Sequence, residues 1–390
     1  MKIGIDARAI LNPEKSAPSG VAHYVWHLVK NILEIDSPAS PNRGEENQYV
    51  LFFDFKVRDK DVKKFARENV KIKFFPFSDY KKYMPGAYSE ILGLATYARE
   101  NLDILHVTSP LYRVPATYRG KIVTTFYDFA PYRVPELFPK ISTARIKALY
   151  RFMAKKSDRI IAVSESTKKD AKEILGYPEK NISVVHNGID KRFFEDCSTP
   201  AEKIKKDYGI SGKYILFLGT LEPRKNLTRV LEGFAKFKNS FQGKFDYQLV
   251  VAGKRGWLFK EYFQQAEDLG IKNDVIFTGY VGGDDLKPLY CHAEFFVMPS
   301  LYEGFGQTIV EAMACGAPCL VSRVASIPEI AGDAALFVDP HDTEGIGKTM
   351  AKLAGDKNLR EELSQKGREQ AKKFSWGKCA RETLEVYKNV

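Results

Sequence analysis

Short, continuous apolar runs recur along nearly the whole 390-residue chain and alternate with amphipathic, helix-like stretches. Strands that are apolar on both faces are typical of parallel sheets covered by helices on both sides. The runs form two series, which predicts two doubly wound α/β domains in a chain too long for one ordinary core. The expected strands are 2–5, 49–53, 72–75, 104–107, 122–126, 159–163 and 183–185, then 214–218, 247–252, 275–277, 295–298, 319–322 and 335–338.

The boundary between the two domains is expected in the polar segment 195–213, which carries Pro200. We therefore expect an N-terminal domain over 1–198 and a C-terminal domain over 199–374, with an amphipathic helix in the tail 375–390. No apolar run approaches the ~20 residues of a spanning helix. The first residues, MKIGIDAR, predict a strand and not a signal peptide, so we expect a protein that is neither membrane-spanning nor exported.

The cysteines and histidines show no spacing typical of a metal site. The cysteines are five, an odd number, and we expect reduced structural thiols in a cytosolic protein. His23 and His27 are four residues apart on an expected helix, but no third ligand lies nearby in the sequence. We therefore expect no metal.

Charge is distributed unevenly along the chain, whose net charge is +11. Residues 1–195 carry 33 Lys and Arg against 23 Asp and Glu, whereas residues 196–390 carry 27 against 26. A basic face can meet anionic lipid headgroups, at roughly 1 kcal/mol per basic residue near the surface, or nucleic acid, or it can simply solubilise the protein. The one-sided placement favours a partner that only the first half touches. The basic residues gather in two clusters: Lys60, Lys63, Lys64, Arg67, Lys71 and Lys73, and Lys140, Arg145, Lys147, Arg151, Lys155, Lys156 and Arg159.

The segment from Ser300 to Ser322, SLYEGFGQTIVEAMACGAPCLVS, carries the strongest functional signal. Glu303 lies in a glycine-rich turn, and Glu311 follows within a predicted helix, about 12 Å further along an axis. Glycines let a ligand approach the backbone, and the free N–H groups of a helix N-terminus attract phosphate. This arrangement suits a sugar nucleotide, with sugar hydroxyls, diphosphate and ribose in a row. The alternative is an ordinary glycine turn with two solvated glutamates, but the small residues before Pro318 predict a helix packed against parallel strands.

This segment resembles the E-G-F-G…E-A-x-x-x-G-x-P signature of retaining GT-B glycosyltransferases of family 4, and the resemblance covers most of the chain. It implies two Rossmann-like domains facing across a cleft, with the tail helix crossing back onto the first domain. By the resemblance, Glu303 holds sugar hydroxyls and stabilises an oxocarbenium-like transition state, and Glu311 holds ribose. The donor-binding positions implied here are Glu303, Gly304, Phe305, Gly306, Gln307, Thr308 and Glu311.

A second group of residues, 219–226, follows the first strand of the second series, at the end where doubly wound folds bind ligands. Arg224 and Lys225 can clamp a diphosphate, because guanidinium binds oxygens in bidentate fashion and ammonium acts as a point charge. A surface pair is the alternative, but the register matches the family's R-x(4–5)-K or R-K-N clamp; which cation dominates stays open. By the resemblance, Lys254 and Val281 lie at strand ends that frame the base, although the sequence alone favours ordinary strand-end turns there. The donor-binding positions added here are Gly219, Arg224, Lys225, Lys254 and Val281.

The first domain offers candidates for the acceptor side. Gly20 and Val21 open an expected helix after a loop over 12–19, which resembles the family's glycine loop facing the reacting centre. Ser164 and Asn187 follow the sixth and seventh strands and match family segments that line the cleft. Ser164 is also a good helix N-cap, and we favour that role.

Tyr127 and Asp128 end the fifth strand, where members of the family commonly carry His-Asp. A phenol can hydrogen-bond a sugar hydroxyl, but it supplies no imidazole base. A retaining mechanism needs no strong base if the leaving phosphate takes the acceptor's proton. The replacement of the family's His by Tyr127 therefore leaves the role of this position open, whereas Asp128 keeps the residue that the family carries.

The resemblance thus implies a metal-independent retaining transferase whose catalytic positions are Glu303, Arg224, Lys225 and Asp128. The stretches GIDAR and YDFAPYRVPE resemble bacterial mannosyltransferases of O-antigen and capsule assembly, so we expect GDP-mannose as donor and an undecaprenyl-diphosphate-linked glycan as acceptor. We expect a cytoplasmic protein, peripheral at the inner membrane face, whose first domain meets anionic lipid and not nucleic acid. The alternatives are a UDP-sugar donor, a soluble synthase acting on a small acceptor, and a non-catalytic protein that binds nucleic acid or another polyanion.

Overall fold

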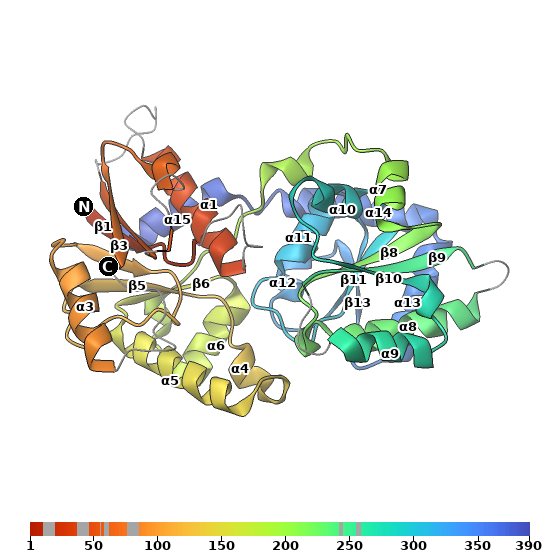
Figure 1. Cartoon of the computed structure of the whole chain (residues 1–390), viewed down its shortest axis with the longest axis horizontal. Coiled ribbons are helices and arrows are strands. Elements are labelled where there is room, and N and C mark those ends of the chain that lie inside the picture. Colours follow the sequence, from red (N-terminus) through yellow and green to blue (C-terminus); the bar gives the residue numbers. More distant parts are fainter. Residues whose placement is uncertain are drawn as a thin grey trace. The chain divides into compact units, whose positions relative to one another are not determined.

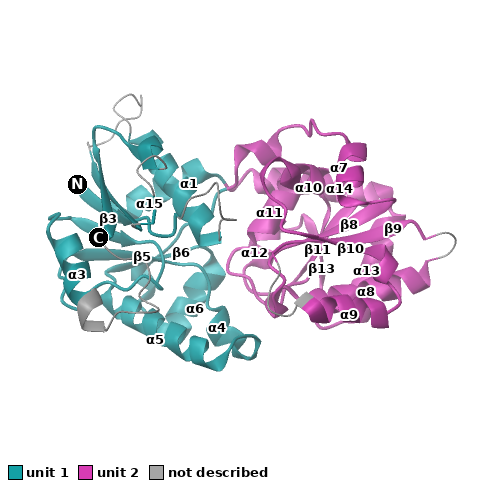
Figure 2. Cartoon of the chain, viewed as in Figure 1, with its two compact units in different colours: residues 1–188, 375–390 teal, residues 189–374 magenta. Residues whose placement is uncertain are grey.

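The chain divides into two compact units, residues 1–188 with 375–390, and residues 189–374 (Figure 2). The computed structural model describes residues 1–10, 20–36, 47–54, 56–57, 62–75, 86–241, 245–254 and 259–390, without the side chains of 86–89 and 259. The division falls at 188/189, before the 198/199 boundary expected from the sequence. The reason is local: Phe193 packs edge-on against Tyr290, and Arg192 donates to the carbonyl of Gly283 (3.4 Å), so this connecting segment belongs to the second unit.

Within the described residues, the first unit contains a seven-stranded parallel sheet in the order β3-β2-β1-β4-β5-β6-β7 (Figure 1). Its strands are β1 (Lys2–Asp6), β2 (Gln48–Asp54), β3 (Val70–Phe75), β4 (Ile104–Val107), β5 (Lys121–Phe126), β6 (Arg159–Ala162) and β7 (Ile182–Val184). Its helices are α1 (Gly20–Ile35), α3 (Gly86–Ala98), α4 (Ala130–Arg133), α5 (Lys140–Lys156), α6 (Glu165–Leu175) and α15 (Trp376–Lys388).

Separate apolar cores lie on the two faces of this sheet. One joins α1 and α15 to β1 and β2, and the others join the opposite face to α5 and α6. The tail helix α15 packs on α1, where the ring of Trp376 stacks on His27 with centroids 4.9 Å apart. Gly188 allows this packing, because a Cβ there would lie 2.1 Å from the backbone nitrogen of Trp376.

The second unit has a six-stranded parallel sheet, within the part of the chain described, in the order β10-β9-β8-β11-β12-β13. Helices α8, α9 and α13 lie on one face, and α7, α10, α11, α12 and α14 on the other (Figure 1). The strands are β8 (Lys213–Leu218), β9 (Tyr247–Ala252), β10 (Val275–Gly279), β11 (Phe295–Met298), β12 (Cys319–Ser322) and β13 (Ala335–Val338). The helices are α7 (Ala201–Tyr208), α8 (Leu227–Ser240), α9 (Phe259–Asp268), α10 (Leu286–Cys291), α11 (Gln307–Ala314), α12 (Ile327–Ala331), α13 (Thr343–Gly355) and α14 (Lys357–Ala371).

Each strand expected from the sequence is present, and the ends move by no more than a few residues. The expected strand 72–75 begins earlier, at Val70, and the expected strand 159–163 ends at Ala162. The doubly wound α/β fold class is therefore confirmed. Among the described residues, no helix is both long and apolar enough to cross a bilayer.

Candidate active site

The strand order of the second unit places a ligand crevice between β8 and β11. The chain winds from β8 toward β10 on one side and from β11 toward β13 on the other. At such a reversal the loops leaving two neighbouring strands diverge, and ligands bind at the carboxyl ends of the strands between them. The loop after β8 contains a 3₁₀ turn, η5 (Pro223–Lys225), and the loop after β11 leads through Glu303 to α11. The two motifs singled out from the sequence therefore meet at this point.

Glu303 is held between the two predicted phosphate-binding cations. Its Oε2 accepts from Arg224 Nη1 at 3.0 Å and its Oε1 from Lys225 Nζ at 2.6 Å. Ser300 Oγ also donates to Oε1, at 2.8 Å. Arg224 is held at its other nitrogen by Glu222, 2.6 Å away, so two carboxylates balance two cations before any donor is present.

Burial alone would raise the pKa of the Glu303 carboxyl, which is 5% exposed. The adjacent charges of Lys225 and Arg224 outweigh burial and lower this pKa to about 2. Glu303 is thus ionised at neutral pH. It can accept hydrogen bonds from sugar hydroxyls, or stabilise positive charge on a sugar carbon.

Asn226, to which the sequence assigned no role, fixes the loop that carries the cations. It lies in the left-handed region with φ +65°, a conformation that Asn tolerates better than most residues. Its buried side-chain amide donates to the carbonyls of Pro299 (2.9 Å) and Pro340 (2.7 Å). Because these prolines follow β11 and β13, one side chain joins three strand ends. An Asn just before a predicted helix is the only signal in the sequence.

Gly253 allows the ends of β8 and β9 to lie against one another. Gly219 N–H donates to Ala252 O, and Gly253 N–H donates to Gly279 O at 2.8 Å. Gly253 has φ +155°, and a Cβ there would lie 1.7 Å from Gly219 O, so no other residue fits. The close approach of Gly253 to Gly219 therefore places the predicted position Gly219 beside the end of β9, at one side of the crevice between β8 and β11.

The two positions predicted to frame a base lie on the same edge. Lys254 is exposed, with Nζ 5.6 Å from the ring centre of Tyr280, whereas Val281 is buried. Tyr280 itself is 53% exposed, which leaves a ring face open at this end of the site.

Helix α11 begins directly after the glycine turn, and Gly306, with φ +93°, precedes its first residue. The first-turn N–H groups of a helix lack intrahelical partners and favour anions. Gln307 and Thr308, in that first turn, are half-buried, whereas Gly304 and Phe305 are buried in the turn before it. Five of the seven positions predicted in this segment, Gly304 to Thr308, thus directly follow Glu303.

Glu311 lies on the buried side of α11, where the sequence placed the second carboxylate. Its Oε2 accepts from the phenol of Tyr290 at 3.0 Å, and Gln307 is also hydrogen-bonded to it. Burial dominates these bonds and raises the pKa of Glu311 to about 7. Tyr290, on α10, was missed because no pattern in the sequence links α10 to α11.

In the first unit, four of the six predicted acceptor residues follow the carboxyl ends of β5, β6 and β7. Ser164 accepts from Thr167 N–H at 3.1 Å, which confirms its role as the N-cap of α6. Thr167 in turn donates to the Tyr127 carbonyl at 3.3 Å. The phenol of Tyr127 donates to Thr108 O at 2.6 Å, so it can only accept from a ligand. Asp128 Oδ1 accepts from Ala130 N–H at the start of α4.

The remaining first-unit positions lie at the start of α1 and in the segment that follows β7. Gly20 is the first residue of α1 and has open space where a Cβ would point, with Val21 next to it; the expected loop 12–19 falls outside the described residues. Asn187 is buried, and its Oδ1 accepts no hydrogen bond from the described residues.

Considering only the described residues, no group of three or more His, Cys, Asp or Glu side chains is arranged to hold a metal ion. His23 and His27 lie with ring centroids 4.4 Å apart, beside Trp376.

Both the sequence and the fold of this chain match those of known proteins. The model of the family "Glycosyl transferases group 1" matches residues 200–370, and that of "Glycosyltransferase Family 4" matches residues 42–193. The chain is 32% identical over 269 residues to O-antigen chain mannosyltransferase B of Escherichia coli, covering 69% of this chain and 70% of that one. It is 31% identical to N-acetyl-alpha-D-glucosaminyl L-malate synthase of Bacillus anthracis, covering 70% of each. HepE of Anabaena, solved with UDP and glucose, shares the fold with a TM-score of 0.75 over 100% of both chains, at 17% identity. The chain therefore belongs to family 4 of the glycosyltransferases and has the GT-B fold.

Proposed function

We propose that this glycosyltransferase moves mannose from GDP-mannose onto a lipid-linked glycan during assembly of a cell-surface polysaccharide, with retention of configuration and without a metal. The observation that carries the proposal is the meeting of Arg224, Lys225 and Glu303 at the switch point of the second sheet. The choice of donor is supported by the named E. coli relative, a mannosyltransferase.

In the proposed mechanism the diphosphate takes over the two cations that Glu303 holds. Arg224 and Lys225 then neutralise charge that develops on the leaving phosphate, an electrostatic contribution typical of transferases. The first-turn N–H groups of α11 add further positive potential. Glu303, released from the cations, accepts from sugar hydroxyls and stabilises the oxocarbenium-like carbon. Because two side-chain cations serve the diphosphate, no divalent ion is required.

Helix α5 supplies the proposed contact with an anionic membrane surface. It carries six basic residues and no acidic one. Lys156 donates to two backbone carbonyls, whereas the other five form no ion pair with any carboxylate of the described residues. Ile141, at the start of the helix, is 89% exposed. An exposed apolar side chain among unpaired cations suits a lipid headgroup region. The five cations without a carboxylate partner are Lys140, Arg145, Lys147, Arg151 and Lys155, of which Lys147 and Arg151 lie over the ring of Tyr132.

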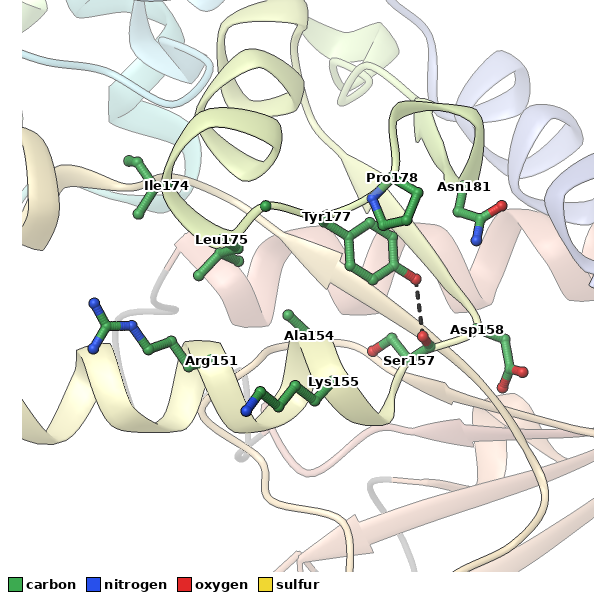
Figure 3. Close-up of a pocket in the computed structure, with 11 residues that line it drawn as sticks. Arg151, Ala154, Lys155, Ser157, Asp158, Ile174, Leu175, Tyr177, Pro178 and Asn181 are labelled. Carbon is green, nitrogen blue, oxygen red and sulfur yellow. Dashed lines mark hydrogen bonds between the residues drawn. The ribbon is translucent and has the colours of Figure 1, made fainter.

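A groove of about 550 Å³ continues this basic surface between the ends of α5 and α6 (Figure 3). Arg151 and Lys155 lie on one side of it, and Ile174 and Leu175 on the other. Its floor is fixed by the phenol of Tyr177, which donates to the carbonyl of Ser157 at 2.9 Å. Cations opposite apolar side chains match a phosphate headgroup with its first methylene groups.

The other basic cluster of the sequence contributes less to such a surface. Lys71 and Lys73 lie 2.8 and 3.3 Å from the carboxylate of Glu100, and Lys2 lies 3.6 Å from it. Lys60 falls outside the described residues. We therefore assign the membrane contact to α5.

Calorimetry with GDP, UDP, GDP-mannose and UDP-glucose, with and without EDTA, tests the donor. We expect binding of the two guanine nucleotides that EDTA leaves unchanged. Binding of UDP and UDP-glucose alone would identify a UDP-sugar as the donor instead of GDP-mannose. Loss of nucleotide binding in EDTA would contradict metal independence. The name of the Bacillus anthracis relative supports an alternative, transfer to a small acceptor; turnover with a small hydroxyacid and none with lipid-linked glycan would establish it.

Flotation with anionic vesicles tests the membrane surface. Replacing Lys140, Arg145, Lys147 and Arg151 by Gln should weaken binding, while the same change at four exposed, ion-paired lysines of the second unit should not. These controls are Lys348, Lys357, Lys366 and Lys372. Equal losses in both variants would indicate a nonspecific charge effect, and unaltered binding in the first would remove α5 from the proposal.

A further inference from the structure

Buried serine side chains hold the turn that carries Glu303. Ser300, Ser322 and Ser326 are each 0% exposed. Ser322, the last residue of β12, donates its hydroxyl to the carbonyl of Ser300 at 2.5 Å. Ser326, which precedes α12, donates to the backbone carbonyl of Glu303 at 2.9 Å. Side chains from the end of β12 and the start of α12 therefore fix the backbone of this turn at two points.

Ser300 differs from the other two serines, because its own hydroxyl binds the carboxylate of Glu303 and not a backbone group. Within the described part of the chain, three side chains donate to this carboxylate. Arg224 donates to Oε2, whereas Lys225 and Ser300 both donate to Oε1. Arg224 and Lys225 are the cations that the proposed mechanism transfers to the diphosphate. Ser300 is neutral, so it gains far less from a phosphate and stays with the carboxylate.

We propose that Ser300 is a positioning residue that holds Glu303 Oε1 after the diphosphate has taken over the two cations. Oε2, which loses its bond from Arg224, is then the oxygen that faces the sugar. It accepts from a sugar hydroxyl or stabilises the oxocarbenium-like carbon, while Oε1 stays with Ser300. The inference rests on the proposed roles of Arg224, Lys225 and Glu303 in transfer.

The hydroxyl of Ser300 suits this role because neither its backbone nor its surroundings adjust easily. Strands β11 and β12 pair as far as Met298 and Val321, and the bond from Ser322 continues that contact beyond the paired residues. Ser300 is completely buried, and a hydroxyl group occupies less space than a water molecule, so no water replaces it when it is removed. Without it the carboxylate rotates once its cations leave, and small displacements of a catalytic group reduce rates strongly.

Kinetics and calorimetry on Ser300→Ala test the positioning role. We expect kcat with GDP-mannose to fall by about tenfold or more, while the dissociation constant of GDP changes by less than about threefold, because both cations remain in place. The acid limb of the kcat profile should move to higher pH, since the Ser300 hydroxyl is one of the groups that lower the pKa of Glu303. A role in folding the turn alone would weaken GDP binding together with kcat and leave the acid limb in place.

The matched control is Ser326→Ala. It removes an equally buried hydroxyl from the same turn, but one that binds the backbone carbonyl of Glu303 and not its carboxylate. We expect this variant to lose free energy of unfolding, but the acid limb of its kcat profile should stay where it is in the wild type. Equal shifts in both variants, or a wild-type kcat in Ser300→Ala, would overturn the positioning role.

A double-mutant cycle tests the contact without any assay of activity. Urea denaturation gives the free energies of unfolding of Ser300→Ala, Glu303→Ala and the double variant. We expect the two losses not to add, since Ser300 has no carboxylate to bind once Glu303 is removed, and additive losses would contradict the inference. Turnover of GDP-mannose by Glu303→Ala at the wild-type rate, or none by the wild type, would contradict the proposed function instead. The cycle would still decide whether Ser300 acts on Glu303.

Discussion

The ammonium group of Lys225 lies 2.6 Å from Glu303 Oε1, although the two residues are 78 positions apart in the chain. The contact exists because β8 and β11 are neighbours at the point where the sheet reverses its winding. It places the group proposed to stabilise the sugar cation against a group proposed to bind the departing phosphate. Without donor each neutralises the other. In the proposed mechanism the diphosphate replaces Glu303 beside the cations, and sugar hydroxyls then donate to the released carboxylate.

Replacing Glu303 by Gln should separate catalysis from binding. We expect turnover to fall by about 100-fold or more, on the scale found when a transition-state electrostatic contact is removed. Affinity for the nucleoside diphosphate should stay the same or increase, because the carboxylate no longer competes for Arg224 and Lys225. Initial rates and calorimetry on the same preparation measure both. Turnover near that of the wild type would contradict the catalytic role.

Replacing Arg224 by Lys keeps the positive charge but removes the planar guanidinium group, which can donate to several oxygens at once. Arg224 donates to Glu222, Tyr302 O and Glu303 at once, a geometry that an ammonium on a flexible stem does not reproduce. We expect nucleoside diphosphate to bind about tenfold more weakly, with little change for the monophosphate. The matched control is Lys236→Met, which removes an exposed, ion-paired cation from the following helix. Equal losses for mono- and diphosphate would place Arg224 away from the second phosphate.

The sequence predicted the strands well, because they follow from local signals, and the resemblance assigned both motifs to one donor site. Continuous apolar runs mark buried parallel strands, and residues just after such strands share one edge of the sheet. The N-cap role of Ser164 was predictable for the same reason, since the cap lies three residues from its donor.

What the sequence did not predict depends on side chains from distant segments. The two basic clusters look alike as sequence, yet Glu100 holds Lys71 and Lys73 of the first cluster while α5 has no such carboxylate. The bond from Tyr290 to Glu311 requires α10 and α11 to pack on one face in one register. No local pattern encodes that register.

Asn226 offers a test of how the site is assembled. Asn226→Ala removes both hydrogen bonds to buried carbonyls and places in the left-handed region a residue that tolerates it less well than Asn, so we expect a loss of about 2 to 4 kcal/mol in the free energy of unfolding. Asn226→Gly removes the same bonds but accepts φ +65°, and should be less destabilising. Urea denaturation of the three proteins measures the difference. If the Ala and Gly variants both lose little free energy of unfolding, the Asn226 side chain does not hold the three strand ends together.

The raised pKa of Glu311 makes both stability and nucleotide binding depend on pH. Burial raises this pKa to about 7, so the folded protein holds a proton that the unfolded chain releases near pH 4.5. Between these two values the folded state binds more protons, and its stability must therefore fall as pH rises, by about 3 kcal/mol for a shift of this size. As the carboxylate ionises around pH 7 it becomes the better acceptor for ribose hydroxyls in the proposed site, so nucleotide affinity should rise toward the upper end of the pH window in which stability falls.

Glu311→Gln keeps the shape of the neutral acid and removes its titration. The stability of this variant relative to the wild type should increase from pH 5 to pH 8, because only the wild type ionises a buried carboxyl in this range. Its nucleotide affinity should be lower than that of the ionised wild type and should not change with pH. Urea denaturation and calorimetry at pH 5, 6, 7 and 8 test both curves. The difference between the two proteins isolates Glu311, because Glu303, with its pKa lowered to about 2, stays ionised in both across this window. Parallel stability curves for wild type and variant would show that Glu311 is already ionised at pH 5 in the folded protein, and that Tyr290 and Gln307 outweigh burial.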